Sequence, residues 1–298
     1  MVTGALPEEL RDLYPFQSRF LQMDSQSPEG SLKYHYLDEG RGETLLMLHG
    51  NPTWSFYYRN LVKGLRDRYR CVAPDHIGCG FSDKPQVYNY TLAQHIDNLE
   101  YFIDQLQLAN ITLVMHDWGG AIGMGYAARH PQNIKRLVIF NTAAFLSGRI
   151  PLSINVCRLP VIGPVAIRFF NAFARIATLR ACKNRIRMSG KVRRGYLAPY
   201  DSYANRIANL RFVQDIPMSP DVPSYPVVKY IESRLDLFRD RPIIIMWGKK
   251  DFCFDDHYLA RWKTIYPTAT VHEIADAGHY VVEDAYERII PWMRNFIG

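Results

Sequence analysis

The sequence lacks the features that mark membrane-spanning, disulfide-rich and nucleic-acid-binding proteins. It contains no apolar run of 18 residues, so no transmembrane helix is expected, and its first residues lack the basic-then-apolar order of a secretion signal. Its five cysteines are odd in number and show no C-x-x-C spacing, which favours reduced thiols and a cytoplasmic location over disulfides or zinc. No known nucleic-acid-binding motif is present, so a nucleic-acid partner is not expected.

Acidic residues are scarce in one segment of the chain. Residues 149–215 hold 13 lysines and arginines but only two acidic residues, a charge of +11, whereas the rest of the chain carries −4. A basic helical surface is most often simply solvated, but it can also attract anionic lipid or an acidic partner. The sequence therefore leaves three alternatives open for this segment: peripheral membrane association, assembly with other enzymes, and self-association.

What the sequence does contain is a regular alternation of strands and helices. The 298 residues are 48% hydrophobic, which is enough for a large core. Short apolar runs alternate with segments of helical periodicity, an order that predicts a mostly parallel sheet covered by helices on both faces. The expected strands are Phe16–Met23, Leu32–Asp38, Glu43–Leu48, Cys71–Pro74, Ile111–Met115, Arg136–Asn141, Pro242–Trp247 and Ala269–Ile274.

The alternation is interrupted between two of these strands. Helical periodicity is expected over Val161–Leu179, Lys183–Gly190 and Ser202–Val213, with no strand between them. An insertion between two sheet strands should fold over the strand ends and exclude water from whatever lies beneath it. We therefore predict an α/β core of residues 1–148 and 226–298 and a helical cap of residues 149–225.

The stretch around Asp117 has the pattern of a nucleophile elbow, a sharp strand-to-helix turn that exposes a reactive side chain. The apolar run Ile111–Met115 precedes it, and the small-residue run Gly119–Ala128 follows it. A carboxylate is ionised at neutral pH and can attack an electrophilic carbon directly, whereas a serine needs a base first. The alternative is that Asp117 only caps the following helix.

Two further residues make a catalytic interpretation stronger. Asp251 and His279 each follow a predicted strand, and the chain order Asp117, Asp251, His279 is that of α/β-hydrolases, with nucleophile, acid and histidine in turn. Each residue alone is compatible with a structural role, but the three together are not easily explained in that way. Nearby acids that do not directly follow a strand end are weaker candidates: Asp255, Asp256, Asp276, Glu283 and Asp284.

Over essentially its whole length the chain resembles the haloalkane dehalogenase family of α/β-hydrolases. The resemblance is carried by His49–Trp54, Asp75–Pro85, His116–Gly120, Trp247–Asp251 and Ala277–His279. It implies cleavage of carbon–halogen bonds through a covalent alkyl ester on the carboxylate of the elbow, with a small hydrophobic substrate and no metal or organic cofactor.

The resemblance also assigns roles to individual residues. Asp117 would attack the carbon that bears the halogen, and Asn51 and Trp118 would hold the leaving halide, because an amide and an indole N–H are neutral donors. The backbone N–H groups of Asn51 and Trp118 would form the oxyanion hole. His279, oriented by Asp251, would activate the water that cleaves the ester.

Three other functions are compatible with parts of this pattern. Phe252-Cys-Phe after Asp251 and the arginine-rich cap resemble a branch of the family that contains β-lactone decarboxylases of long-chain olefin biosynthesis, which would use the same site. Epoxide hydrolases share the elbow and use cap tyrosines, here Tyr196, Tyr200 and Tyr203, although Asn51 argues against them. A non-catalytic receptor is disfavoured because no catalytic group is missing.

Overall fold

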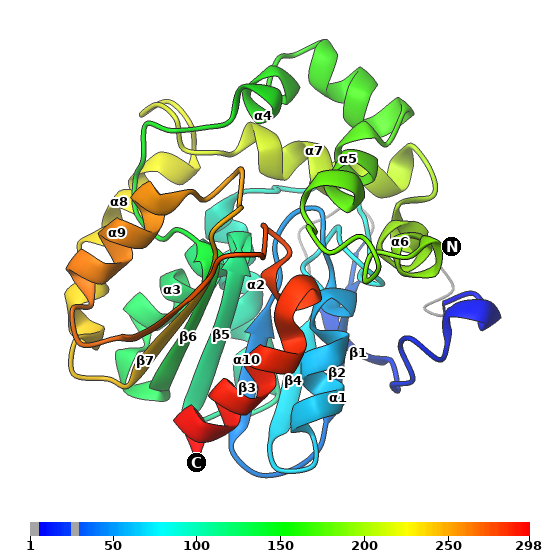
Figure 1. Ribbon diagram of the computed structural model, residues 1–298. Coiled ribbons are helices and arrows are strands. Elements are labelled where there is room, and N and C mark those ends of the chain that lie inside the picture. Colours follow the sequence, from blue (N-terminus) through cyan, green and yellow to red (C-terminus); the bar gives the residue numbers. More distant parts are fainter. Residues whose placement is uncertain (1–5, 25–29) are drawn as a thin grey trace.

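The central sheet has eight strands in the order β1-β2-β4-β3-β5-β6-β7-β8 (Figure 1). The computed structural model describes residues 6–24 and 30–298. β2 is antiparallel to β1 and β4, and the other neighbouring strands are parallel, so the predicted α/β-hydrolase architecture is confirmed. The strands are β1 (Arg19–Met23), β2 (Leu32–Glu39), β3 (Thr44–Leu48), β4 (Arg70–Pro74), β5 (Ile111–Asp117), β6 (Ile134–Thr142), β7 (Ile243–Gly248) and β8 (Thr270–Ile274).

Ten α-helices accompany the sheet in the described part of the chain. Successive residues of the parallel strands point alternately into two separate cores, as strand geometry requires. Helices α2, α3, α8 and α9 cover one face of the sheet, and α1 and α10 cover the other. The helices are α1 (Arg59–Leu65), α2 (Leu92–Gln105), α3 (Trp118–Arg129), α4 (Leu152–Cys157), α5 (Ala172–Arg180), α6 (Gly190–Leu197), α7 (Ile207–Gln214), α8 (Ser224–Glu232), α9 (Asp256–Ile265) and α10 (Val281–Ile297).

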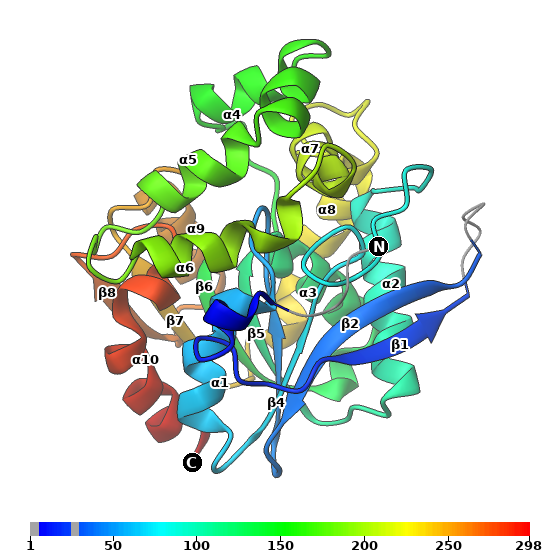
Figure 2. The ribbon, with the colours of Figure 1, turned by 90° about the vertical axis from the view of Figure 1, so that its right-hand side faces the viewer.

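Helices α4 to α7 lie above the sheet, as Figures 1 and 2 show from two directions. The strands β3, β5, β6 and β7 end beneath them. This placement supports the predicted division into a core of residues 1–148 and 226–298 and a cap of residues 149–225, which we retain as a proposal. Helix α8 begins at Ser224, close to the proposed boundary, and packs against α3 of the core. No helix among residues 6–24 and 30–298 combines the length and the apolarity needed to cross a bilayer.

The prediction of one long helix over Val161–Leu179 is wrong. The structure has a π-helical turn η4 (Pro164–Phe169), then a left-handed residue, Asn171, with φ of +52°, and only then α5. Asparagine adopts this conformation more readily than most residues. Its side-chain amide donates a hydrogen bond of 3.0 Å to the carbonyl of Tyr200, a contact that periodicity cannot reveal.

The predicted helix Lys183–Gly190 is also wrong. The backbone N–H groups of Lys183 and Asn184 are bonded to the carboxylate of Asp284 in α10, so they do not continue a helix. Helix α6 begins at Gly190, after Ser189, whose hydroxyl accepts a hydrogen bond from the N–H of Val192. The predicted helix Ser202–Val213 is present only as a short 3-10 turn followed by α7, while α4 and α8 lie where no separate helix was expected.

Candidate active site

Asp117 lies at the end of β5, on the turn that begins α3. Its φ of +51° and ψ of −127° are unfavourable for a residue with a side chain, as is typical of a nucleophile elbow. The turn is held by close packing, since a Cβ at Gly119 would overlap the carbonyl of Leu48 and a Cβ at Gly120 would overlap the side chain of Thr142. The Thr142 hydroxyl also donates a hydrogen bond to the carbonyl of Asp117. The small residues after the elbow therefore have a steric cause.

The two carboxylate oxygens of Asp117 have different surroundings. Oδ1 accepts a hydrogen bond of 2.6 Å from the N–H of Asn51, and the N–H of Trp118 also donates to the carboxylate. Oδ2 lies 3.7 Å from Nε2 of His279. Burial raises the pKa of Asp117 above its usual value, although His279 and the two backbone donors oppose this. The N–H of Asn51 therefore holds Oδ1, while Oδ2 faces His279. The N–H groups of Asn51 and Trp118 are the donors that would stabilise the oxyanion formed when an ester on this carboxylate is hydrolysed.

His279 lies between the carboxylates of Asp117 and Asp251. Its Nδ1 donates a hydrogen bond of 2.9 Å to Oδ2 of Asp251, which leaves the lone pair of Nε2 directed towards Asp117. The N–H of Cys253 in turn donates to Oδ1 of Asp251 at 2.6 Å. Burial lowers the pKa of His279, but the two carboxylates outweigh this and raise it above the ordinary value of 6.5. The structure thus brings together all three residues of the predicted set.

Three aromatic side chains that the sequence analysis did not assign to the site support His279. The ring of Phe254 is stacked against the imidazole of His279, with ring centroids 5.8 Å apart. The ring of Phe252 is tilted relative to the same imidazole, with ring centroids 6.0 Å apart. Nε2 of His116 donates a hydrogen bond of 2.8 Å to the carbonyl of His279. The only sequence signal for these roles is proximity, because Phe252 and Phe254 flank Cys253 just after Asp251 and His116 precedes Asp117.

Asp284, a weaker catalytic candidate in the sequence, has a different place in the structure. It lies in the first turn of α10, is buried, and accepts hydrogen bonds from the N–H groups of Lys183 and Asn184 of the cap and of Gly278 beside His279. The thiol of Cys182 donates to the same carboxylate. Asp284 therefore ties the cap to the loop that carries His279.

Asp284→Asn should destabilise the protein by about 2–4 kcal/mol, because an amide directs two hydrogens towards groups that are themselves donors. Urea unfolding of the variant beside the wild type measures this difference. Asp276→Asn is the control, since Asp276 is an exposed acid whose partner is Arg288 on the surface. A loss equal to that of the control would show that the Asp284 contacts add little to stability.

Asn51 and Trp118, the predicted anion donors, both line a cavity beside Asp117. The side-chain amide of Asn51 donates to the carbonyl of Asn209 at 3.1 Å, and its Oδ1 is buried without a partner among the described residues. An amide has two N–H donors, so one remains for a ligand. Asn141, at the end of β6, is not part of this cavity; its side chain bonds to both backbone groups of Gly248 in β7.

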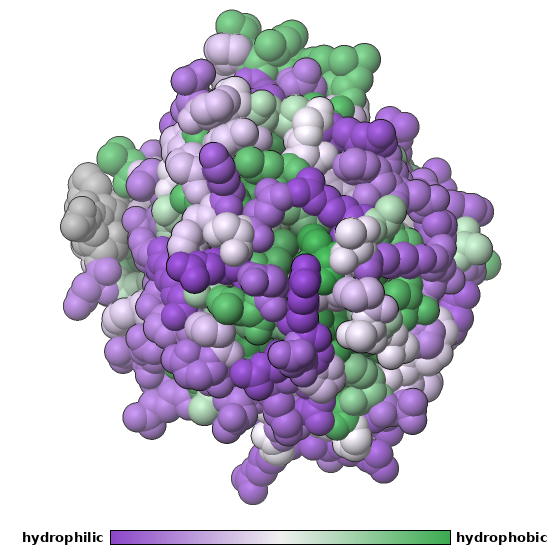
Figure 3. Space-filling view, turned by 90° about the vertical axis from the view of Figure 1, so that its left-hand side faces the viewer, coloured by the Kyte–Doolittle hydropathy of each residue, from purple (hydrophilic) through white to green (hydrophobic). Residues whose placement is uncertain are grey.

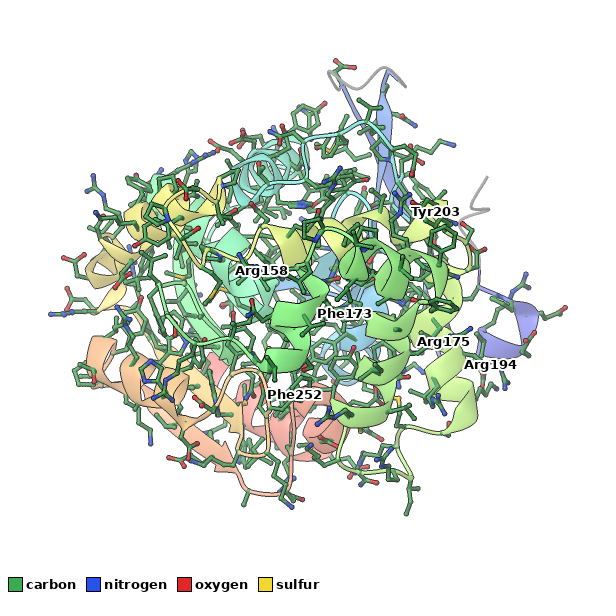
Figure 4. The ribbon with its side chains drawn as sticks, turned by 90° about the horizontal axis from the view of Figure 1, so that it is seen from above. Arg158, Phe173, Arg175, Arg194, Tyr203 and Phe252 are labelled. Atoms are coloured by element: carbon green, nitrogen blue, oxygen red, sulfur yellow. The ribbon has the colours of Figure 1, made fainter. Side chains whose placement is uncertain are left out.

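The cavity above Asp117 has a volume of about 260 Å³ and a mainly apolar wall. Its wall is formed by core residues such as Phe252 and Phe254 and by cap residues such as Phe173 and Ile176. Figure 4 shows Phe173 and Phe252 from above, in the middle of the molecule. An apolar cavity that ends at a carboxylate, two N–H donors and an imidazole suits a hydrophobic substrate with one electrophilic carbon.

The three cap tyrosines that epoxide opening would use lie elsewhere. The hydroxyl of Tyr196 donates to Glu283, and that of Tyr200 donates to the carbonyl of Thr53. Tyr203 is partly exposed and packs on Arg168. None of the three is among the described residues that line the cavity, which argues against the epoxide hydrolase alternative.

The fold and the arrangement of these residues are those of an α/β-hydrolase, and comparisons with known proteins agree. The model of the alpha/beta hydrolase fold family matches residues 43–286, so the chain belongs to this enzyme family. Within it, the chain belongs to the group that contains the haloalkane dehalogenases and the cis-3-alkyl-4-alkyloxetan-2-one decarboxylases, that is, β-lactone decarboxylases.

Two kinds of relative define this group. The chain is 50% identical to the cis-3-alkyl-4-alkyloxetan-2-one decarboxylase of Shewanella oneidensis, over 97% of this chain and 90% of that protein. It is 31% identical to haloalkane dehalogenase 2 of Mycobacterium tuberculosis, over 93% of both chains. The crystal structure of the haloalkane dehalogenase DatA from Agrobacterium tumefaciens C58 matches with a TM-score of 0.81 at 24% identity, over 94% of this chain and 96% of that one, which bears on the fold alone.

Proposed function

We propose that this protein converts cis-3-alkyl-4-alkyl β-lactones into alkenes and CO₂, with Asp117 as the attacking group. The observation that carries the proposal is the mainly apolar cavity that Asp117 lines together with cap and core side chains. Such a wall suits two alkyl chains better than it suits a polar substrate. The proposal is supported by the two relatives of 50% and 46% identity that carry the decarboxylase name, whereas relatives named haloalkane dehalogenase are 31–32% identical.

The reaction balances in two steps without any other reactant. In the first, Oδ2 of Asp117 bonds to the ring carbon that carries the lactone oxygen, and the ring carbon–oxygen bond breaks to leave a free carboxylate. In the second, the bond to that carboxylate breaks, CO₂ leaves, and its electron pair forms the carbon–carbon double bond while the bond to Asp117 breaks. Asn51 and Trp118, as donors at the same cavity, would hold the carboxylate released in the first step.

Haloalkane hydrolysis is the second candidate, and one observation favours it. The His279–Asp251 pair and the two backbone N–H donors to the Asp117 carboxylate are what the hydrolysis of an alkyl ester requires, yet decarboxylation consumes no water. A halide and a carboxylate are both leaving anions, so the same donors can serve either substrate. Both reactions would begin with the same attack by Asp117.

A head-to-head assay of one enzyme preparation tests the proposal. The substrates are a cis-3,4-dialkyl β-lactone and a bromoalkane of similar chain length, with alkene and bromide as the respective products. We expect kcat/KM for the lactone to exceed that for the bromoalkane by at least about a hundredfold, because the cavity then accommodates both alkyl chains. Bromide release with an unreacted lactone would overturn the proposal in favour of dehalogenation.

The pH dependence should differ between the two substrates. Hydrolysis needs neutral His279, whose pKa is raised by Asp251 and Asp117, so bromide release should fall as the pH decreases through a value above 6.5. Decarboxylation needs only ionised Asp117 and should persist to lower pH. Profiles of kcat, which includes the hydrolysis of the ester, measure this for both substrates, and Asp251→Asn should move the acid limb of bromide turnover to lower pH. Identical acid limbs for the two reactions would contradict these roles.

The remaining expectations concern location and partners. Named relatives act on small hydrophobic compounds, haloalkanes or alkyl lactones, and we propose the same substrate class here. The five cysteines are free, which supports the expected cytoplasmic location. Association with a membrane, with other enzymes or with a second copy through the basic cap remains a proposal. The surface of the cap favours the membrane, as argued below.

A further inference from the structure

Exposed apolar side chains are concentrated on the outer surface of the cap. Leu152 and Val161 are 77% and 75% exposed, and Phe169 and Phe170 are each 65% exposed. Figure 3 shows hydrophobic atoms gathered at the top of the molecule, over the cap. We call these side chains the cap patch: Leu152, Val156, Leu159, Val161, Ile162, Val165, Phe169, Phe170, Ile176, Leu179 and Ile186. An exposed apolar surface of this extent normally marks an interaction site.

The segment that carries the cap patch is strongly basic. The sequence has no acidic residue between Arg149 and Asp201. Arg175, Arg180, Arg185 and Arg194 are exposed and form no ion pair with any residue in the described ranges. Figure 4 shows Arg175 and Arg194 on the same side of the cap, seen from above. A second copy of the chain would bring the same positive charge, so the complementary surface is anionic.

The cap patch also connects with the substrate cavity. The helices that carry it present other side chains inward, since Ile154 and Cys157 of α4 and Ala166 of η4 line the cavity. Ile176 of α5 lines the cavity and is 48% exposed, so the apolar wall continues from the cavity to the outer surface. A long-chain substrate could therefore pass from an apolar phase to Asp117 along an apolar surface.

We propose that the cap patch docks on an anionic lipid bilayer and admits the substrate from the bilayer into the cavity. The aliphatic and aromatic side chains enter the interface, and the arginines contact anionic headgroups. This combination of exposed apolar side chains with arginines that form no ion pair among the described residues is the composition of interfacial helices that lie on a membrane without crossing it. Only the identity of the admitted substrate rests on the proposed decarboxylase function.

Vesicle sedimentation tests the docking without any catalytic readout. The full-length protein is mixed with phosphatidylcholine vesicles that contain or lack phosphatidylglycerol, and the bound fraction is measured. We expect binding to the anionic vesicles that weakens with salt, and about tenfold weaker binding for Phe169→Ser/Phe170→Ser and for Arg175→Glu/Arg185→Glu. Leu237→Ser, which removes an exposed leucine of the core, is the control and should bind as the wild type does.

The possible results separate docking from the proposed function. Absence of binding to anionic vesicles, or equal binding by the wild type and both double variants, would overturn the docking. The cap patch would then be a binding surface for an acidic protein. With docking, the double variants should turn over a long-chain lactone dissolved in vesicles more slowly, while turnover of a dispersed short-chain lactone stays unchanged. Vesicle binding by a protein that is inactive on every lactone would refute the decarboxylase function but not the docking.

Discussion

Asp117→Asn should abolish both lactone decarboxylation and bromide release, with kcat reduced by about four orders of magnitude or more. The amide is nearly isosteric with the carboxylate, but it carries no charge and is a poor nucleophile, so the bond to the substrate carbon cannot form. Alkene and bromide production by the purified variant, measured over hours, gives the size of the loss.

The control for this variant is Asp256→Asn, since Asp256 is an exposed acid at the start of α9 that pairs with Lys249. It should retain activity close to that of the wild type. Circular dichroism should show the same thermal transition for both variants within a few degrees. Asp117→Asn with more than a few per cent of wild-type activity on either substrate would show that the carboxylate does not bond to carbon.

His279→Ala should separate the two reactions. With a bromoalkane, the variant should release about one bromide per active site and then stop, with steady-state hydrolysis reduced by about 10² to 10⁴-fold, because no base activates the water. With the β-lactone, which consumes no water, alkene formation should fall by no more than about tenfold. Rapid-mixing measurements of bromide release and gas chromatography of the alkene provide the two readouts. Equal losses on both substrates would show that His279 takes part in decarboxylation as a base.

The sequence predicts the core and the candidate site well because both depend on local patterns. The carboxyl ends of β5 and β7 and the turn after β8 meet at one edge of the sheet, so Asp117, Asp251 and His279 come together once the strand order is correct. Their catalytic roles remain proposals. Local patterns also set the start of α2, where the hydroxyl of Thr91 accepts the N–H of Gln94 as an N-cap.

The interior of the cap could not be predicted because its helix ends are set by distant partners. Asn171 is held by Tyr200, and the segment after Cys182 is held by Asp284, about 100 residues away in the chain. The apolar positions alone do not encode such bonds. The stacking of Phe254 on His279 could not be predicted either, since an aromatic residue in a loop has no periodicity to reveal which way it points.

The central claim is that Asp117 bonds covalently to a carbon atom of the substrate. The most direct test is mass spectrometry of His279→Ala after incubation with a bromoalkane, followed by digestion and sequencing of the peptide that contains Asp117. We predict a mass increase equal to the alkyl group minus one hydrogen, located on Asp117 and absent from the Asp117→Asn/His279→Ala double variant. Unmodified peptide together with continuing formation of free alcohol would contradict the claim.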